Sequence, residues 1–179
     1  MKKYLYMIAA LFGIDYFCKE NIEAQKPEDF PRDMEKSHGK IRLYRNHNDG
    51  FCFGVKKEKK ELVRMVPVVF TSAAAGILTW LLCRDEGRKA DRIGFALITA
   101  GGLSNLYDRL KRGYVVDYFS IRCKYLEKVV FNLGDFFIFA GSALIAASDL
   151  LGAVRDLSFP AEAHIKALRL PWRKTDEAE

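Results

Sequence analysis

The chain has 179 residues, a length that suits a single domain. Half of the residues are hydrophobic, the formal net charge is +6 and the pI is near 9.1. The mean hydropathy of −0.09 would suit a soluble protein, but it averages over separate apolar and charged blocks. The positive charge suits either anionic lipid headgroups or nucleic acid. Because basic and aromatic residues do not alternate as in nucleic-acid binding surfaces, we expect no nucleic-acid partner.

Four apolar segments predict four membrane-spanning helices. Residues 65–83 carry no charge and, at 1.5 Å per residue, are about long enough to cross the hydrocarbon core. The other three segments carry a polar or charged residue near one end, and they cover 4–18, 93–109 and 129–151. A soluble protein of this length has too little polar surface to bury four such helices. We therefore expect a mainly α fold, a four-helix transmembrane bundle within one integral membrane domain over 1–179.

The first of these segments follows Lys2 and Lys3, as the apolar core of a signal peptide does. No cleavage site of two small residues follows it, and the next polar residues are Asp15 and Lys19. We therefore expect this segment to remain in the protein as its first helix.

Two polar connections and a charged tail complete the chain. Within the first connection, residues 41–44 and 51–55 have strand-like composition on either side of the turn signal Asn48-Asp49-Gly50. A small β-structure on the membrane surface is therefore expected. In the tail, Leu168, Leu170 and Trp172 are interspersed with Arg169, Arg173 and Lys174, which is typical of an interfacial segment. The positive charges fall on both sides of the predicted spans and leave the orientation open.

Four cysteines are present, but no two have the C-x-x-C spacing of a metal site. Cys18 and Cys83 lie in predicted spans, while Cys52 and Cys123 lie in the two connections. A disulfide between Cys52 and Cys123 is open at this point, and no metal ligand is expected.

Asp117 and Asp135 carry the chemistry that the sequence most strongly indicates. Both lie at the ends of apolar segments. An ionised carboxylate costs free energy at or near hydrocarbon and is rare there unless it has a function. Two carboxylates held close together cannot both ionise easily, so one keeps its proton while the other acts as a base. Such a pair activates water for peptide hydrolysis, which is our leading hypothesis. The alternative is that each carboxylate caps a helix or strand end, or pairs with Arg109.

Further polar residues accompany this pair in the sequence. Asn105 and Arg109 are four residues apart and share a helix face, and Asp108 lies beside Arg109 at the end of the third span. Asn132 precedes Asp135 by three residues, where it either orients that carboxylate by a hydrogen bond or caps the helix. Structural alternatives exist for the others too: Asn105 bonds a neighbouring helix, and Asp108 forms an interfacial ion pair with Arg109.

Taken together, four pieces of the chain resemble the lipoprotein signal peptidases (signal peptidase II), the intramembrane aspartyl proteases of bacteria. In chain order these pieces are Asp15 to Lys19, Asn48 to Gly54, Gly101 to Asp117, and Phe131 to Asp135. One such piece would be a weak signal, whereas four in the family's order are highly specific.

The resemblance implies where the protein lies. It implies a multi-pass protein of the bacterial cytoplasmic (inner) membrane, with a small β-cradle and the active site near the outer face. Segments 19–64 and 110–128 are then extracytoplasmic, and the tail 152–179 is cytoplasmic. We expect the protein to work as a monomer among membrane lipids.

The resemblance also implies an activity and assigns residues to it. The activity is removal of the signal peptide from prolipoproteins, just before a cysteine that already bears diacylglycerol. It needs no metal or cofactor, and globomycin, a cyclic peptide, inhibits it. Asp117 and Asp135 are then the catalytic dyad. The substrate-binding or supporting residues are Asn48, Gly50, Asn105, Arg109 and Asn132, and the structural residues are Asp15, Lys19 and Asp108.

Three features depart from the family's pattern. Gly134 stands where alanine is usual, which costs about 1 kcal/mol of helix propensity. Phe51 and Cys52 replace residues that are commonly small, and the first connection is longer and more charged than expected. We expect these differences to affect substrate preference rather than the type of reaction.

Two other classes of function compete with a protease. A transporter or proton-conducting protein would bind an ion at Asp117 and Asp135, but the predicted spans hold no charges deep within them to line a path. A catalytically silent scaffold that binds lipoproteins or lipids has no need of both carboxylates.

Overall fold

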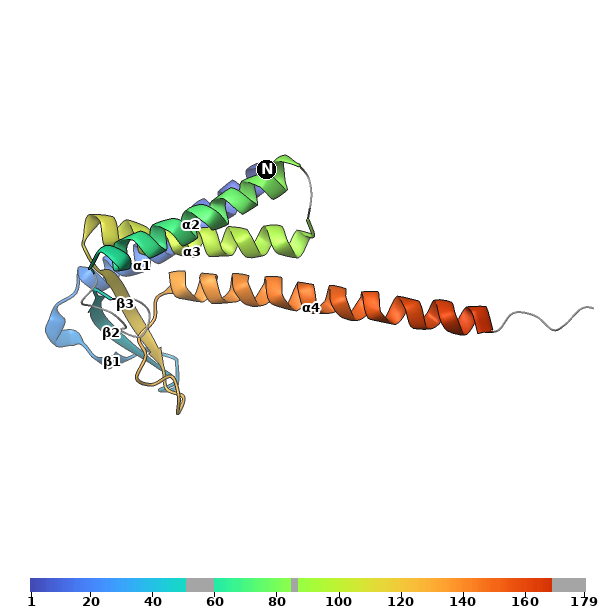
Figure 1. The fold of residues 1–179 in the computed structure, drawn as a ribbon. Coiled ribbons are helices and arrows are strands. Elements are labelled where there is room, and N and C mark those ends of the chain that lie inside the picture. The colour runs from blue at the N-terminus through green and yellow to red at the C-terminus, as the bar shows by residue number, and fades with distance from the viewer. Residues whose placement is uncertain (51–59, 85–86, 169–179) are drawn as a thin grey trace, which may run out of the picture. The chain divides into compact units, whose positions relative to one another are not determined.

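The computed structural model describes residues 1–50, 60–84 and 87–168. The elements in chain order are α1 (Lys2–Glu23), the 3-10 helix η1 (Pro27–Asp29), β1 (Arg32–Asp33), β2 (Ile41–Asn48), α2 (Lys60–Cys83), α3 (Lys89–Lys111), β3 (Val115–Ile121) and α4 (Leu133–Leu168). Residues up to Ile145 form one compact unit, in which the small sheet lies at one end of α1, α2 and α3 (Figure 1). The predicted fold class is thus confirmed in its coarser form, as mainly helical with a small antiparallel sheet.

Each predicted span coincides with a helix, although the bounds differ. The first three helices extend beyond their predicted spans at one or both ends. The fourth begins later than predicted, at Leu133, and continues past 151 to Leu168. Because α4 begins only at Leu133, Asp135 lies in the first turn of this helix rather than in its middle.

Two of the described helices are long and apolar enough to cross a membrane. They contain the stretches Met65–Cys83 in α2 and Leu133–Arg155 in α4. In α2 the apolar side chains largely face away from the protein, with Phe70 73% and Val69 60% exposed. A large exposed apolar surface of this kind is unusual for a soluble protein and suits contact with lipid.

The central helix is α3, which packs against both α1 and α2. Its buried residues are mostly small, and they include Gly94, Ala96, Thr99, Ala100, Gly101 and Gly102. A Cβ atom at Gly101 would lie 2.1 Å from the carbonyl oxygen of Gly134 in α4. Small residues let helix backbones approach this closely. Gly101 therefore allows α3 and α4 to pack closely, and Gly102 likewise lies close to Thr71 of α2.

The sheet has the strand order β1-β2-β3, and both pairings are antiparallel. The register places Asn46 of β2 opposite Asp117 of β3. Phe131 bridges to Phe119 of β3, which places the chain beside β3 just before α4 begins. The strand predicted from residue 41 is confirmed and runs to Asn48. Its predicted partner, residues 51–55, lies outside the described residues, as does Cys52 of the open disulfide question.

We predict that Gly101→Ala destabilises the protein and that Gly76→Ala does not. The methyl group at position 101 would overlap the Gly134 carbonyl and push α3 and α4 apart, and overpacking of this kind typically costs about 1–3 kcal/mol. Gly76 is the matched control, since it is also helical and no described atom lies within 4 Å of its Cβ position. Thermal unfolding midpoints in one detergent test this. Equal midpoints for the two variants would contradict the packing described here.

Candidate active site

Asp117 and Asp135 line one pocket of about 240 Å³. Asp117 comes from β3 and Asp135 from the first turn of α4, and both are buried, with 3% and 8% of their surface exposed. The remaining polar residues of the lining are Asn48, Thr71, Asn105 and Arg109, and its apolar wall includes Pro67, Phe70, Phe131, Ile138 and Phe139. The two aspartates predicted to act together are therefore brought to the same cavity.

Asn132 joins the two aspartates. Its Nδ2 atom donates to Asp117 Oδ1 at 2.7 Å, and its Oδ1 atom accepts from the backbone N–H of Asp135 at 2.9 Å. Its own backbone N–H donates to Asp135 Oδ2 at 3.3 Å. These last two contacts are reciprocal, as in a capping box at a helix start. Asn132 therefore caps the start of α4, and its side-chain amide donates to Asp117 while its backbone N–H donates to Asp135.

Two other asparagines donate to the same carboxylates. Asn48 Nδ2 donates to Asp117 Oδ2 at 3.0 Å, while its Oδ1 accepts from the N–H of Gly50 at 3.0 Å. Asn105 Nδ2 donates to Asp135 Oδ1 at 2.8 Å. The three asparagines thus supply neutral amide donors to both members of the pair. Asn48, Asn105 and Asn132, three of the expected supporting residues, therefore lie around Asp117 and Asp135.

The environment favours a proton on Asp117. Burial, followed by the charge of Asp135, raises the pKa of Asp117 to about 7, while the hydrogen bonds from Asn48 and Asn132 oppose part of this rise. Near neutral pH this carboxyl group is therefore able both to hold and to release a proton. This is the behaviour expected of one member of a carboxylate pair that shares a proton.

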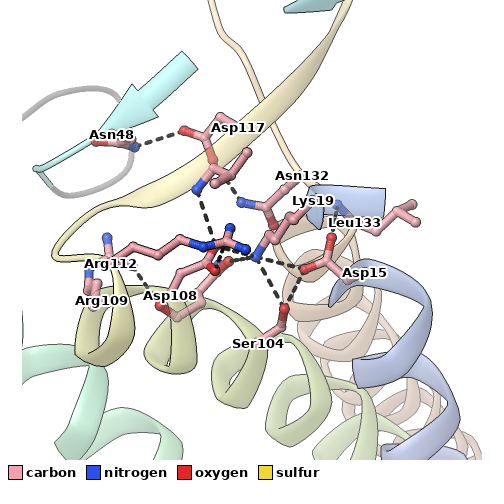
Figure 2. A network of polar contacts seen from close by, with 12 residues as sticks. Asp15, Lys19, Asn48, Ser104, Asp108, Arg109, Arg112, Asp117, Asn132 and Leu133 are labelled. Atoms are coloured by element: carbon pink, nitrogen blue, oxygen red, sulfur yellow. Dashed lines mark hydrogen bonds and ion pairs between the residues drawn. The ribbon is translucent and has the colours of Figure 1, made fainter. Parts of the chain in front are cut away.

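A second buried cluster lies beside the dyad and is centred on Lys19 (Figure 2). Lys19 Nζ lies 2.8 Å from Asp15 Oδ2 and 3.1 Å from Asp108 Oδ2. Arg112 lies 3.2 Å from the other oxygen of Asp108. Arg112 also pairs with Glu20, 2.6 Å away, so each charge in the cluster faces a partner of opposite sign, as burial of ionised groups requires.

Asp15 connects this cluster to the segments that bear the dyad. Its Oδ1 atom accepts from the hydroxyl of Tyr118 at 3.0 Å and from the N–H of Leu133 at 3.1 Å. Tyr118 follows Asp117 in β3, and Leu133 begins α4. Asp15, Lys19 and Asp108 thus occupy a buried ion cluster, in line with the structural role predicted for them, and the cluster holds β3 and α4 beside α1.

Arg109 and Gly50 meet at the edge of the pocket. Arg109 Nη2 donates to the carbonyl oxygen of Gly50 at 2.9 Å, so the turn that orients Asn48 is attached to α3. Residues 51–54 of the same family-like piece, including Phe51 and Cys52, lie outside the described residues.

Sequence reasoning missed several members of the buried cluster. Ser104 donates to Asp15 Oδ2 at 2.6 Å and accepts from Lys19 at 3.1 Å, and Arg112 pairs with Asp108. One signal was available, because Ser104, Asp108 and Arg112 are spaced four residues apart and so share one face of α3. Within the described residues, no group of three His, Cys, Asp or Glu side chains is arranged to hold a metal ion.

Two solved structures have a fold similar to that of this chain. A bacterial membrane enzyme solved by the in meso method at 2.3 Å has a TM-score of 0.70 and 18% identity, over 100% of this chain and 96% of that one. A second, solved at 1.9 Å, has a TM-score of 0.68 and 19% identity, over 84% and 94% of the two chains. This chain therefore shares the fold of these two proteins, and here the fold carries two buried aspartates in one pocket.

Sequence comparisons define the family. A model described as Signal peptidase (SPase) II matches residues 7–151. A lipoprotein signal peptidase of Mesorhizobium japonicum is 30% identical over 156 residues, covering 87% of this chain and 89% of that protein. One from Brucella ovis is 34% identical over 116 residues, covering 65% and 71%. The chain belongs to the signal peptidase II family, whose members are proteases that remove signal peptides from prolipoproteins.

We predict that the stabilising effect of Asp117→Asn grows with pH. Because folding raises the pKa of Asp117 from 3.8 to about 7, the folded state binds more protons than the unfolded state between these values. Stability then falls as pH rises through this window, and the asparagine variant lacks this dependence. The unfolding midpoint of the variant minus that of the wild type should therefore increase from pH 4 to pH 8.

Asp29→Asn serves as the control, because Asp29 is exposed. The difference in unfolding midpoint between this variant and the wild type should stay the same from pH 4 to pH 8. If the difference in unfolding midpoint for Asp117→Asn is also independent of pH, this would contradict the raised pKa of Asp117.

Proposed function

We propose that this chain is an aspartyl endopeptidase that removes signal peptides from diacylglyceryl-modified prolipoproteins by cleaving before the lipidated cysteine. One observation carries the proposal: Asn132 contacts both Asp117 and Asp135, and the two carboxylates line the same pocket. A pair of purely structural carboxylates would have no reason to share both a cavity and a bridging amide. Family membership agrees with this assignment.

In the proposed mechanism, a water molecule lies between the two carboxyl groups. The ionised aspartate takes a proton from this water as its oxygen attacks the scissile carbonyl carbon, and the protonated aspartate donates to the carbonyl oxygen. The tetrahedral intermediate then collapses, the C–N bond breaks, and the leaving nitrogen receives a proton from the aspartate that acted as the base. The pKa of Asp117, about 7, allows such proton exchange near neutral pH.

We further propose that four helices span the bacterial inner membrane, with spans near 4–18, 65–83, 93–109 and 129–151. The sheet then forms a cradle at the outer face, and both termini are cytoplasmic. The exposed apolar side chains of α2 support contact with lipid on that helix. We propose that the protein acts as a monomer.

The apolar wall of the pocket supports a lipid-modified substrate. Phe70 in α2 and Phe139 in α4 line the cavity and are also 73% and 48% exposed. Both side chains therefore border the dyad pocket and the surface that we assign to lipid. The acyl chains of the substrate would lie in lipid between these helices while the peptide bond enters the pocket.

Cleavage by purified protein in detergent tests the proposal, with a diacylglyceryl-modified prolipoprotein as the substrate. We predict cleavage by the wild type, inhibition by globomycin, and a loss of at least about 10²-fold in Asp117→Asn and in Asp135→Asn, because each variant loses an acid–base group. Asp29→Asn should retain full activity, since it changes an exposed carboxylate.

Full activity in either dyad variant would contradict the assignment of Asp117 and Asp135 as the catalytic pair. A folded wild type that binds the substrate without cleaving it would instead favour the scaffold alternative. Acid-coupled flux in liposomes would favour the transporter alternative.

A further inference from the structure

We propose that Lys19 is a positioning residue for catalysis: it fixes the amide of Asn105 so that Asp135 is the ionised base of the dyad and Asp117 the acid. This inference rests on the proposed function, in which the two aspartates form the catalytic pair. It adds a role for Lys19 beyond the structural one expected from its place in the ion cluster.

The two ends of an asparagine side chain differ in their hydrogen bonding. The amide oxygen only accepts hydrogen bonds and the amide nitrogen only donates them, so a reversed amide would turn an acceptor toward the neighbouring carboxylate. An ionised carboxylate is stabilised by donors and destabilised by a facing oxygen. The orientation of each asparagine beside the dyad therefore decides whether it favours the ionised form.

Each of the three asparagines has its oxygen held by a group that can only donate. For Asn48 this group is the N–H of Gly50, and for Asn132 it is the N–H of Asp135. Both of these donors are backbone groups within three residues of the asparagine. For Asn105 the donor is the ammonium of Lys19, at 2.9 Å from Oδ1 and 86 residues away in sequence. Asn105 alone among the three depends on a distant side chain for its orientation.

Lys19 acts on Asp135 through this orientation in addition to its charge. Asp15 and Asp108 face Lys19 directly, and Arg112 pairs with both Asp108 and Glu20. These carboxylates offset much of the positive charge of the ammonium, which reduces its long-range field at the dyad. The hydrogen bond from Lys19 to Asn105 is short-range and directional, and the neighbouring charges do not cancel it.

The environments of the two aspartates then differ in a consistent direction. Asp135 accepts from an amide whose oxygen is bound to a cation, and it lies in the first turn of α4, where the helix dipole favours negative charge. Asp117 lies on β3 beside the charge of Asp135, and its pKa is raised to about 7. Asp135 is therefore the base that accepts the proton of water, and Asp117 is the acid that donates to the carbonyl oxygen.

The test is the pH dependence of kcat/KM for prolipoprotein cleavage in Lys19→Met. Without the ammonium, the Asn105 amide is free to reverse, and Asp135 loses a stabilising donor to its ionised form. The acid limb of the profile should move to higher pH by about one unit, so that activity falls about tenfold at acid pH and much less at alkaline pH. Asn105→Ala should show the same shift.

A double-mutant cycle separates positioning from stability. If Lys19 acts through Asn105, then Lys19→Met with Asn105→Ala should shift the acid limb no further than either single variant, because contacting residues are not additive. Ser104→Ala is the matched control: it removes another partner of Lys19 but leaves Asn105 in place. It should lower the unfolding midpoint and leave the acid limb at its wild-type pH.

If Lys19→Met does not fold, Lys19→Met with Asp15→Asn leaves the net charge of the cluster unchanged, because one cation and one carboxylate are removed together, and this variant should show the same shift. An acid limb that stays in place in a folded Lys19 variant, or shifts that add in the double variant, would overturn the inference. The same assay measures cleavage by the wild type and its loss in Asp117→Asn. A failure of the proposed function can therefore be distinguished from a failure of the inference about Lys19.

Discussion

The buried ammonium of Lys19 is the contact on which the arrangement of this site depends. It joins α1 to α3 through Asp15 and Asp108, all three being almost fully buried. Removing one partner from a buried ion pair leaves an uncompensated charge, so such a cluster tolerates little displacement. The same Asp15 carboxylate holds Tyr118 in β3 and Leu133 at the start of α4. One cluster therefore positions both segments that carry the proposed dyad.

The buried ion cluster and the dyad differ in the groups that contact their carboxylates. In the cluster, full charges meet full charges, which fixes the geometry of the side chains. The hydrogen bonds that reach Asp117 and Asp135 come instead from neutral amides. A neutral donor stabilises a carboxylate less than a cation does. Burial then keeps the pKa of Asp117 near 7, and the pair remains able to exchange a proton.

Sequence reasoning identified the residues whose position along the chain reveals them. Asp117 and Asp135 were found because each ends an apolar segment, and Asn132 because it lies three residues before Asp135. The link from Lys19 to Asn105 could not be found in this way, because 86 residues separate them and only the packing of α1 on α3 brings them together. Strand β3 was missed for a similar reason, since its pairing with β2 is a tertiary contact.

Gly134 shows how the site can outweigh local helix propensity. The sequence suggested only a cost there, about 1 kcal/mol relative to alanine. In the structure, a Cβ atom at this position would lie 2.9 Å from Asn132 Oδ1 and 3.0 Å from Asp15 Oδ2. These are the side chains that cap α4 and anchor its first residue. The absence of a Cβ lets both approach the start of α4, and the hydrogen bonds they make there offset a cost of this size.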